Sequence, residues 1–133
     1  MKQISTSSDF VWVATPIVKV CCGKDGLPEA DPDPLTVNTH ARQPTLIIWQ
    51  GDNTIDEITD IEFNSPGSEF TDPVRRGPKT WTVIDKCTTG APGNPPTTPG
   101  PKVPYKYTIT AICKGTSDET VKDPVINNQD LGG

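Results

Sequence analysis

The stretch Pro104-Tyr-Lys-Tyr-Thr-Ile-Thr-Ala-Ile-Cys113 decides the fold class of this 133-residue chain. Its side chains alternate strictly, with one set formed by Tyr105, Tyr107, Ile109, Ala111 and Cys113 and the other by Lys106, Thr108 and Thr110. Aromatic and β-branched residues in a period of two predict a strand with one face in a core and the other in water. The rest of the chain is interpreted as what packs against this strand.

Composition favours one all-β domain with long Pro/Gly-rich loops. The chain has 15 Pro and 11 Gly residues, and only 32% of its residues are hydrophobic, yet those residues are grouped in short β-type runs rather than scattered. We therefore predict a flexible N-terminal tail over residues 1–9, a single domain over 10–128 and a flexible C-terminal tail over 129–133.

Further strands follow from short apolar runs bounded by turn residues. The expected strands cover residues 10–22 with a break at Pro16, 35–40, 45–50, 60–63, 80–87 and 121–127. Residues 54–63 are ambiguous, because Ile55, Ile58 and Ile61 recur at a helix-like spacing of three. Strands at these intervals with turns between them predict a two-sheet antiparallel β-sandwich.

The order of these motifs resembles a known type of domain. The motifs are the Ile47-Ile48-Trp49 strand, Ile61 to Phe63, Phe70 followed by Asp72-Pro73, a Trp-containing strand, Tyr105 to Thr108, and Asp123 to Asn127. Over residues 35–128 the chain resembles small, mostly uncharacterised bacterial domains of cupredoxin-like or immunoglobulin-like sandwich type. The resemblance implies a fold and little about activity.

A blue-copper centre is excluded by its ligands. Such a centre needs two His, one Cys and usually a Met, whereas this chain has only His40 and its single Met is the first residue. We expect a metal-free domain without a cofactor.

Four cysteines leave several interpretations open. If residues 80–87 and 104–113 form a hairpin, Cys87 and Cys113 lie about 20 Å apart or more, beyond the reach of a disulfide. In sandwiches of this type the first and last long strands often run parallel as neighbours. This brings Cys21 and Cys22 near Cys113, so the candidate disulfide joins Cys22 or Cys21 to Cys113. Alternatively, Cys113 is a small buried apolar residue. A zinc site from Cys21, Cys22, Cys87 and His40 lacks the usual C-x-x-C spacing.

The Pro/Gly-rich segment 88–104 is the candidate interaction loop, interpreted as an extended hairpin loop. Its candidate contact residues are Pro92, Asn94, Pro96, Pro99 and Pro101. Sandwich domains present loops to partners, so we predict a non-enzymatic protein-interaction or assembly module that binds another protein or itself. The alternative is a non-catalytic domain that binds a small ligand, Ca²⁺ or Zn²⁺ through its acidic loops or its cysteines.

Other classes of function find no support in the sequence. The formal net charge of -5 and the lack of a basic stripe argue against a nucleic-acid partner. No run is long enough to span a membrane, and the polar N-terminal residues lack the apolar core of a signal peptide, so a cytoplasmic location is the default expectation. No catalytic motif accompanies His40, and we predict that the protein is not an enzyme.

Overall fold

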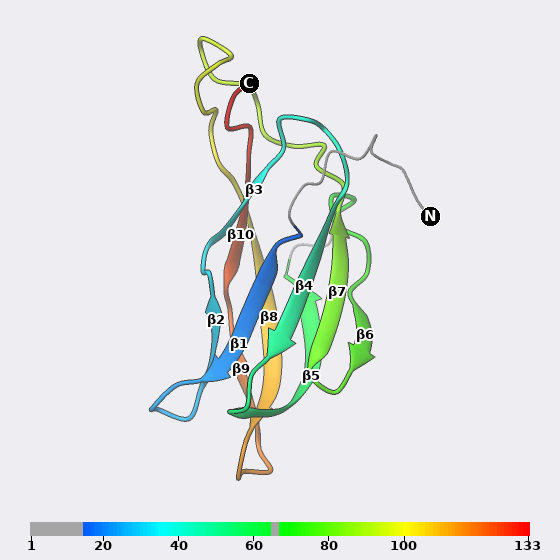
Figure 1. The fold of residues 1–133 in the computed structure, drawn as a ribbon, viewed down its shortest axis with the longest axis vertical. Helices are drawn as coiled ribbons and strands as arrows, with labels where there is room; N and C mark the ends of the chain where they lie inside the picture. Colours follow the sequence, from blue (N-terminus) through cyan, green and yellow to red (C-terminus); the bar gives the residue numbers. More distant parts are fainter. Residues whose placement is uncertain (1–14, 65–66) are drawn as a thin grey trace, which may run out of the picture.

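The computed structural model describes residues 15–64 and 67–133, which form an all-β fold of two sheets (Figure 1). Sheet I has the order β2 (Pro28–Asp31), β1 (Ile17–Cys22), β4 (Thr45–Gly51), β7 (Thr80–Asp85) and β6 (Val74–Gly77). Sheet II has the order β3 (Leu35–Asn38), β10 (Val125–Gln129), β8 (Val103–Cys113) and β5 (Ile55–Phe63), and β9 (Glu119–Lys122) also pairs with β8. The predicted tail 1–9 and the strand residues 10–14 lie outside the described residues.

Both sheets are mixed, so the prediction of purely antiparallel sheets was wrong. β1 runs parallel to β4, with Ile17 opposite Ile48, and β10 runs parallel to β3, with Ile126 opposite Leu35. Parallel neighbours need a long connection. After β2, the chain crosses to sheet II as β3 and returns to sheet I as β4, which supplies that connection for β1 and β4.

The eleven-residue strand β8 is the centre of sheet II. It pairs with β5 along one edge, and along the other with β10 near its start and β9 near its end. Between those two partners, Tyr107 N donates a hydrogen bond to Pro124 O over 3.1 Å. Pro124 itself has no N–H to donate, so it lies between the two strands rather than inside either one.

Strand β5 explains the helix-like spacing of its isoleucines. Ile55, Ile58 and Ile61 are all buried, although a regular strand cannot turn every third residue to the same face. The pairing with β8 shifts register between Ile55 and Glu57 and again between Ile58 and Asp60. Each irregularity inserts an extra residue, and this converts a spacing of three into one buried face.

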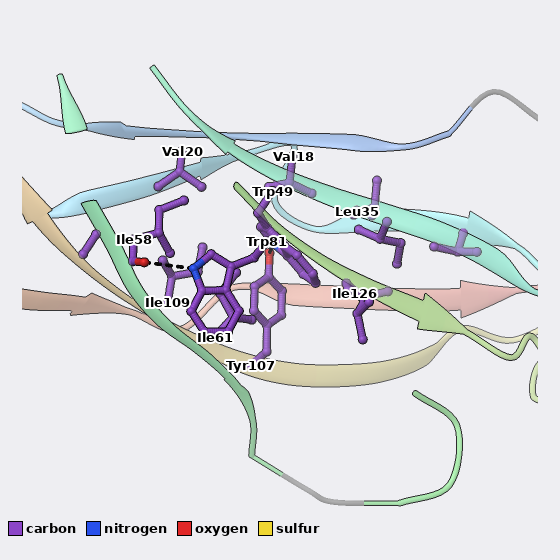
Figure 2. Packing of buried hydrophobic residues seen from close by; sticks show 14 of the residues in the cluster. Val18, Val20, Leu35, Trp49, Ile58, Ile61, Trp81, Tyr107, Ile109 and Ile126 are labelled. Atoms are coloured by element: carbon purple, nitrogen blue, oxygen red, sulfur yellow. Dashed lines mark hydrogen bonds between the residues drawn. The ribbon is translucent and has the colours of Figure 1, made fainter. Parts of the chain in front are cut away.

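The core lies between the two sheets (Figure 2). Its largest members include Trp49 of β4 and Trp81 of β7, which lie directly opposite each other on these two paired strands. Each indole N–H donates across to sheet II, from Trp49 Nε1 to Tyr107 Oη over 3.0 Å and from Trp81 Nε1 to Ile58 O over 2.9 Å. Both tryptophans therefore bury their rings without leaving a polar atom unpaired.

Two strands and one crossover were not predicted from the sequence, because their segments contain turn-forming residues. Neither β2 nor β6 was expected, because both lie between the strands that the apolar runs predicted. Strands β7 and β8 lie in different sheets, so residues 86–102 cross between the sheets instead of closing the expected hairpin. Across residues 15–64 and 67–133, no helix has the length and apolarity needed to cross a membrane.

Candidate interaction surface

Residues 90–102, which we call the arm, project beyond the ends of the sheets at the top of Figure 1, beside the C-terminus. All five contact residues expected from the sequence are exposed, namely Pro92, Asn94, Pro96, Pro99 and Pro101. Only Gly90 and Gly100 in the arm are buried. The arm therefore presents its side chains outward from a buried stem.

Backbone contacts hold the two limbs of the arm together. Thr98 N and Thr98 Oγ1 both donate to Pro95 O, over 2.9 and 2.6 Å, and so close a turn at the tip. A Cβ atom on Gly100 would lie 1.8 Å from Ala91 O, and one on Gly93 would lie 2.2 Å from Thr98 O. Only glycine permits so close an approach of two backbones.

The C-terminal residues anchor the stem of the arm. Gly100 N donates to Asp130 O, and Gln129 Nε2 donates to Gly100 O, each over 2.7 Å. On the other limb, Arg42 donates to Thr89 O over 2.8 Å and to Gly90 O over 2.5 Å. Segment 129–133, expected as a flexible tail, thus begins within β10 and continues as a support for the arm.

Beneath the stem lies a polar cluster, which we define as Glu69, Asp85, Thr88, Thr89 and Asn128. Glu69 is 5% exposed and accepts hydrogen bonds from Thr88 N and Thr89 N over 3.0 Å and from Asn128 Nδ2 over 2.8 Å. Burial alone raises the pKa of Glu69, but the hydrogen bonds from Thr88, Thr89 and Asn128 outweigh it and lower the pKa below its ordinary value. Glu69 is therefore a buried, ionised carboxylate.

Asp85 shares the same amide donor but has the opposite pKa shift. Its Oδ1 accepts from Cys87 N and Asn128 Nδ2, each over 3.0 Å, while its Oδ2 and Asn128 Oδ1 have no partner among the described residues. Burial raises the pKa of Asp85 to about 6, and the nearby charge of Glu69 acts in the same direction. Asp85 is the group of this cluster that exchanges a proton near neutral pH.

The polar cluster was not predicted from the sequence. Glu69, Asp85 and Asn128 come from three distant segments, and carboxylates in loops or at strand ends are ordinarily exposed. Asp85 is the last residue of β7, and its position at the end of a largely apolar strand was the one available signal.

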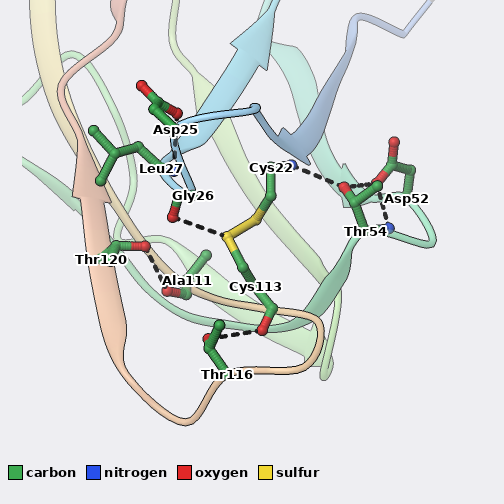
Figure 3. The surroundings of a disulfide bond; sticks show 10 residues. All are labelled: Cys22, Asp25, Gly26, Leu27, Asp52, Thr54, Ala111, Cys113, Thr116 and Thr120. Atoms are coloured by element: carbon green, nitrogen blue, oxygen red, sulfur yellow. Dashed lines mark hydrogen bonds between the residues drawn. A yellow bond between two sulfur atoms is a disulfide. The ribbon is translucent and has the colours of Figure 1, made fainter.

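At the other end of β8, a disulfide joins Cys22 and Cys113 (Figure 3). The Cα atoms are 5.9 Å apart, and 91 residues separate the two cysteines in sequence. From the sequence, the strands that carry these cysteines were expected to be neighbours in one sheet. In the structure, β1 and β8 belong to different sheets. The bond instead crosses from sheet I to sheet II, because both strands end at the same edge of the core.

The remaining cysteines and His40 do not form a common site. Cys21 is partly exposed, whereas the Cys87 thiol is buried, and burial raises its pKa to about 11. A thiol with so high a pKa stays protonated and is a poor nucleophile. His40 Nδ1 lies 2.9 Å from Asp130 Oδ1.

The acidic loops likewise do not converge. Asp52 Oδ1 accepts from Thr54 N over 2.8 Å, so this carboxylate is used within its own turn. In the described part of the chain, no three His, Cys, Asp or Glu side chains are grouped as metal ligands.

Comparison with known proteins adds no family to this picture. No protein-family model matches the chain, and no curated protein is significantly similar to it. The arm and the residues that hold it are therefore the main candidate for a functional surface.

Proposed function

We propose that this protein is a non-enzymatic interaction or assembly module built on a sandwich of immunoglobulin-like or cupredoxin-like type, with the arm as its contact surface. One observation carries the proposal: the arm exposes its side chains while its backbone is fixed from both sides. Its limbs touch through Gly93 and Gly100, and its stem is bonded to Arg42 and Gln129.

Preorganisation gives such a surface its advantage. Ordering a flexible backbone costs about 1–2 kcal/mol per residue, and a binding loop must recover that cost from its contacts. The arm is already ordered by the turn at its tip and by the hydrogen bonds that anchor its stem, so more of its contact energy appears as affinity. Proline side chains add apolar contact area with almost no rotamer entropy to lose.

The proposed partner is a protein, either a second copy of this chain or a different one. Between Gly90 and Pro101 the arm carries no charged residue, and Lys102 at its end is the first. Such a surface makes apolar and backbone contacts rather than the phosphate contacts of nucleic-acid recognition.

A site-specific cross-linking experiment tests the contact surface. A photoreactive residue at Asn94 on the arm is compared with one at Ser117, which is also exposed and lies near the opposite end of β8. If the protein binds itself, we expect purified protein to give a cross-linked oligomer from position 94 and not from position 117. If it binds a different protein, we expect a discrete cross-linked partner from position 94 alone when the experiment is done in cells of the organism that makes the protein. Equal products from both positions, or none from position 94, would contradict the proposal.

A shortened arm tests the same surface without a chemical probe. Replacing residues 93–98 by two glycines keeps Gly90, Gly100 and the stem contacts in place. We expect nearly unchanged thermal unfolding together with the loss of the interaction, measured by light scattering on a size-exclusion column for self-association or by pull-down of the cross-linked partner. If the shortened protein retains the full interaction, the arm is not the contact surface.

A further inference from the structure

A second surface with distinct chemistry lies below the stem of the arm and shares Glu69 with the polar cluster. It is a groove of about 680 Å³ between the end of β5 and segment 67–73. Its aromatic wall is made by Phe63, Phe70 and Tyr105, which are all partly exposed. Phe63 and Phe70 stack with centroids 4.3 Å apart, and Phe70 meets Tyr105 edge to face at 5.0 Å.

The groove is acidic and has no cation of its own. Its carboxylates are Asp60, Glu62, Glu69 and Asp72, and none of the described residues lining it is Lys, Arg or His. The two salt bridges found within residues 15–64 and 67–133 join His40 to Asp130 and Arg75 to Glu57, so neither involves a groove carboxylate.

Glu69 strengthens this negative potential from below. Its hydrogen-bond donors are hydroxyl, amide and backbone N–H groups, which satisfy its oxygens but leave its charge without a counter-charge. A charge that is 5% exposed is screened less than one in water, so its field reaches the adjoining groove.

We propose that this groove binds a lysine or arginine side chain presented by a partner protein. Aromatic faces attract a cation through their π-electrons, and the carboxylates at the same place supply its counter-charges. Arginine is the better fit, since its planar guanidinium both stacks on a ring and bonds a carboxylate in a fork. An anionic segment is repelled, and a purely apolar one leaves the carboxylates desolvated and unpaired.

The binding test uses the full chain and two short probes. One is an acetylated, amidated peptide of alternating glycine and arginine, and the other replaces each arginine by neutral, nearly isosteric citrulline. Binding is followed by NMR through the ring resonances of Phe63, Phe70 and Tyr105. We expect the arginine peptide to shift these resonances with saturation, and the citrulline peptide to leave them unchanged.

Matched charge variants separate the groove from general attraction to an acidic protein. Asp60→Asn with Glu62→Gln removes two of the four carboxylate charges of the groove, whereas Asp118→Asn with Glu119→Gln makes the same charge change at exposed residues where β9 begins. We expect the groove pair to weaken the arginine peptide about fivefold or more and the control pair to have little effect. Phe70→Leu keeps the charges and should weaken binding about two- to fivefold.

Several results would overturn the proposal. They are equal binding of the citrulline peptide, equal weakening by the two charge pairs, and ring resonances that do not shift. Thermal unfolding of each variant shows that it is folded, so weaker binding cannot be assigned to misfolding. The shortened arm should bind the arginine peptide normally, and failure of the groove proposal therefore leaves the proposed function of the arm intact.

Discussion

The two sheets are connected by different kinds of bond near the two ends of β8. At the end of β8, Cys22 of sheet I is covalently bonded to Cys113 of sheet II. At its start, below the arm, Asn128 of sheet II donates hydrogen bonds to Glu69 and to Asp85 of sheet I. The first connection depends on redox conditions and the second on protonation, and the proposed contact surface lies at the end that responds to pH.

Breaking the disulfide should have the largest effect. In Cys22→Ser with Cys113→Ser, we expect the free energy of unfolding to fall by about 4 kcal/mol, because the bond closes a long loop in the unfolded chain. Urea unfolding measures the change. Cys21→Ser is the control, since Cys21 is a free cysteine, and a comparable loss in that variant would show that the disulfide is not the cause.

The polar cluster should make stability depend on pH. The pKa of Asp85 is raised to about 6 in the folded protein, so its neutral form stabilises the fold fully below about pH 4, and this contribution is lost as the pH rises through about 6. A rise of roughly two pKa units corresponds to about 3 kcal/mol. We expect urea midpoints to fall between about pH 4 and pH 7.

Glu69 acts in the opposite direction at lower pH. Because the pKa of Glu69 is lowered in the folded protein, its ionised form stabilises the fold fully above its ordinary pKa. This contribution is lost as the pH falls through the lowered pKa. Asp85→Asn should abolish the decline between about pH 4 and pH 7, and Asp118→Asn at an exposed turn should not. An unchanged profile in Asp85→Asn would assign the pH dependence to other groups.

A single methyl group should disturb the arm. Gly100→Ala places a Cβ atom 1.8 Å from Ala91 O, so the two limbs must separate, at a cost of about 2 kcal/mol. Gly77→Ala is the matched control, because a Cβ atom at Gly77 meets nothing within 4 Å. We expect faster proteolysis within the arm of Gly100→Ala alone, and equal rates in both variants would argue that the limbs are not tightly packed.

The smallest effect compares one hydroxyl at each end of β8. Tyr105 Oη donates to Thr89 Oγ1 over 2.9 Å beside the polar cluster, and Tyr105→Phe should cost about 1 kcal/mol. Thr116 Oγ1 donates to Cys113 O over 2.9 Å near the disulfide, but Thr116 is exposed, and water can replace this bond in Thr116→Val. Urea unfolding of the two variants should therefore differ. Equal losses would mean that burial does not distinguish the two bonds.

Local sequence patterns predicted elements better than their partners. The alternation in Tyr105 to Cys113 predicted a strand, and β8 covers the whole stretch. The same kind of pattern was misleading at Ile55, Ile58 and Ile61, because register shifts against β8 are a property of the pair of strands. A spacing within one strand contains no information about a bulge against another.

Turn residues predicted where the chain bends but not where it goes next. Prolines and glycines marked segment 88–104 as irregular and exposed, and the arm is both. Its path from sheet I to sheet II, and its support by residues 129–130, depend on contacts with parts of the chain that are distant in sequence.

The sequence by itself determined the all-β class, the inward face of β8 and the exposure of the arm, because periodicity, proline and glycine act through the local backbone. Only the tertiary structure decided that the sheets are mixed, that Cys22 meets Cys113 across the core, and that Glu69 and Asp85 share Asn128 beneath the arm. Each of these features brings together residues from distant segments. Burial, which sets their pKa values and their charges, exists only after the two sheets have packed.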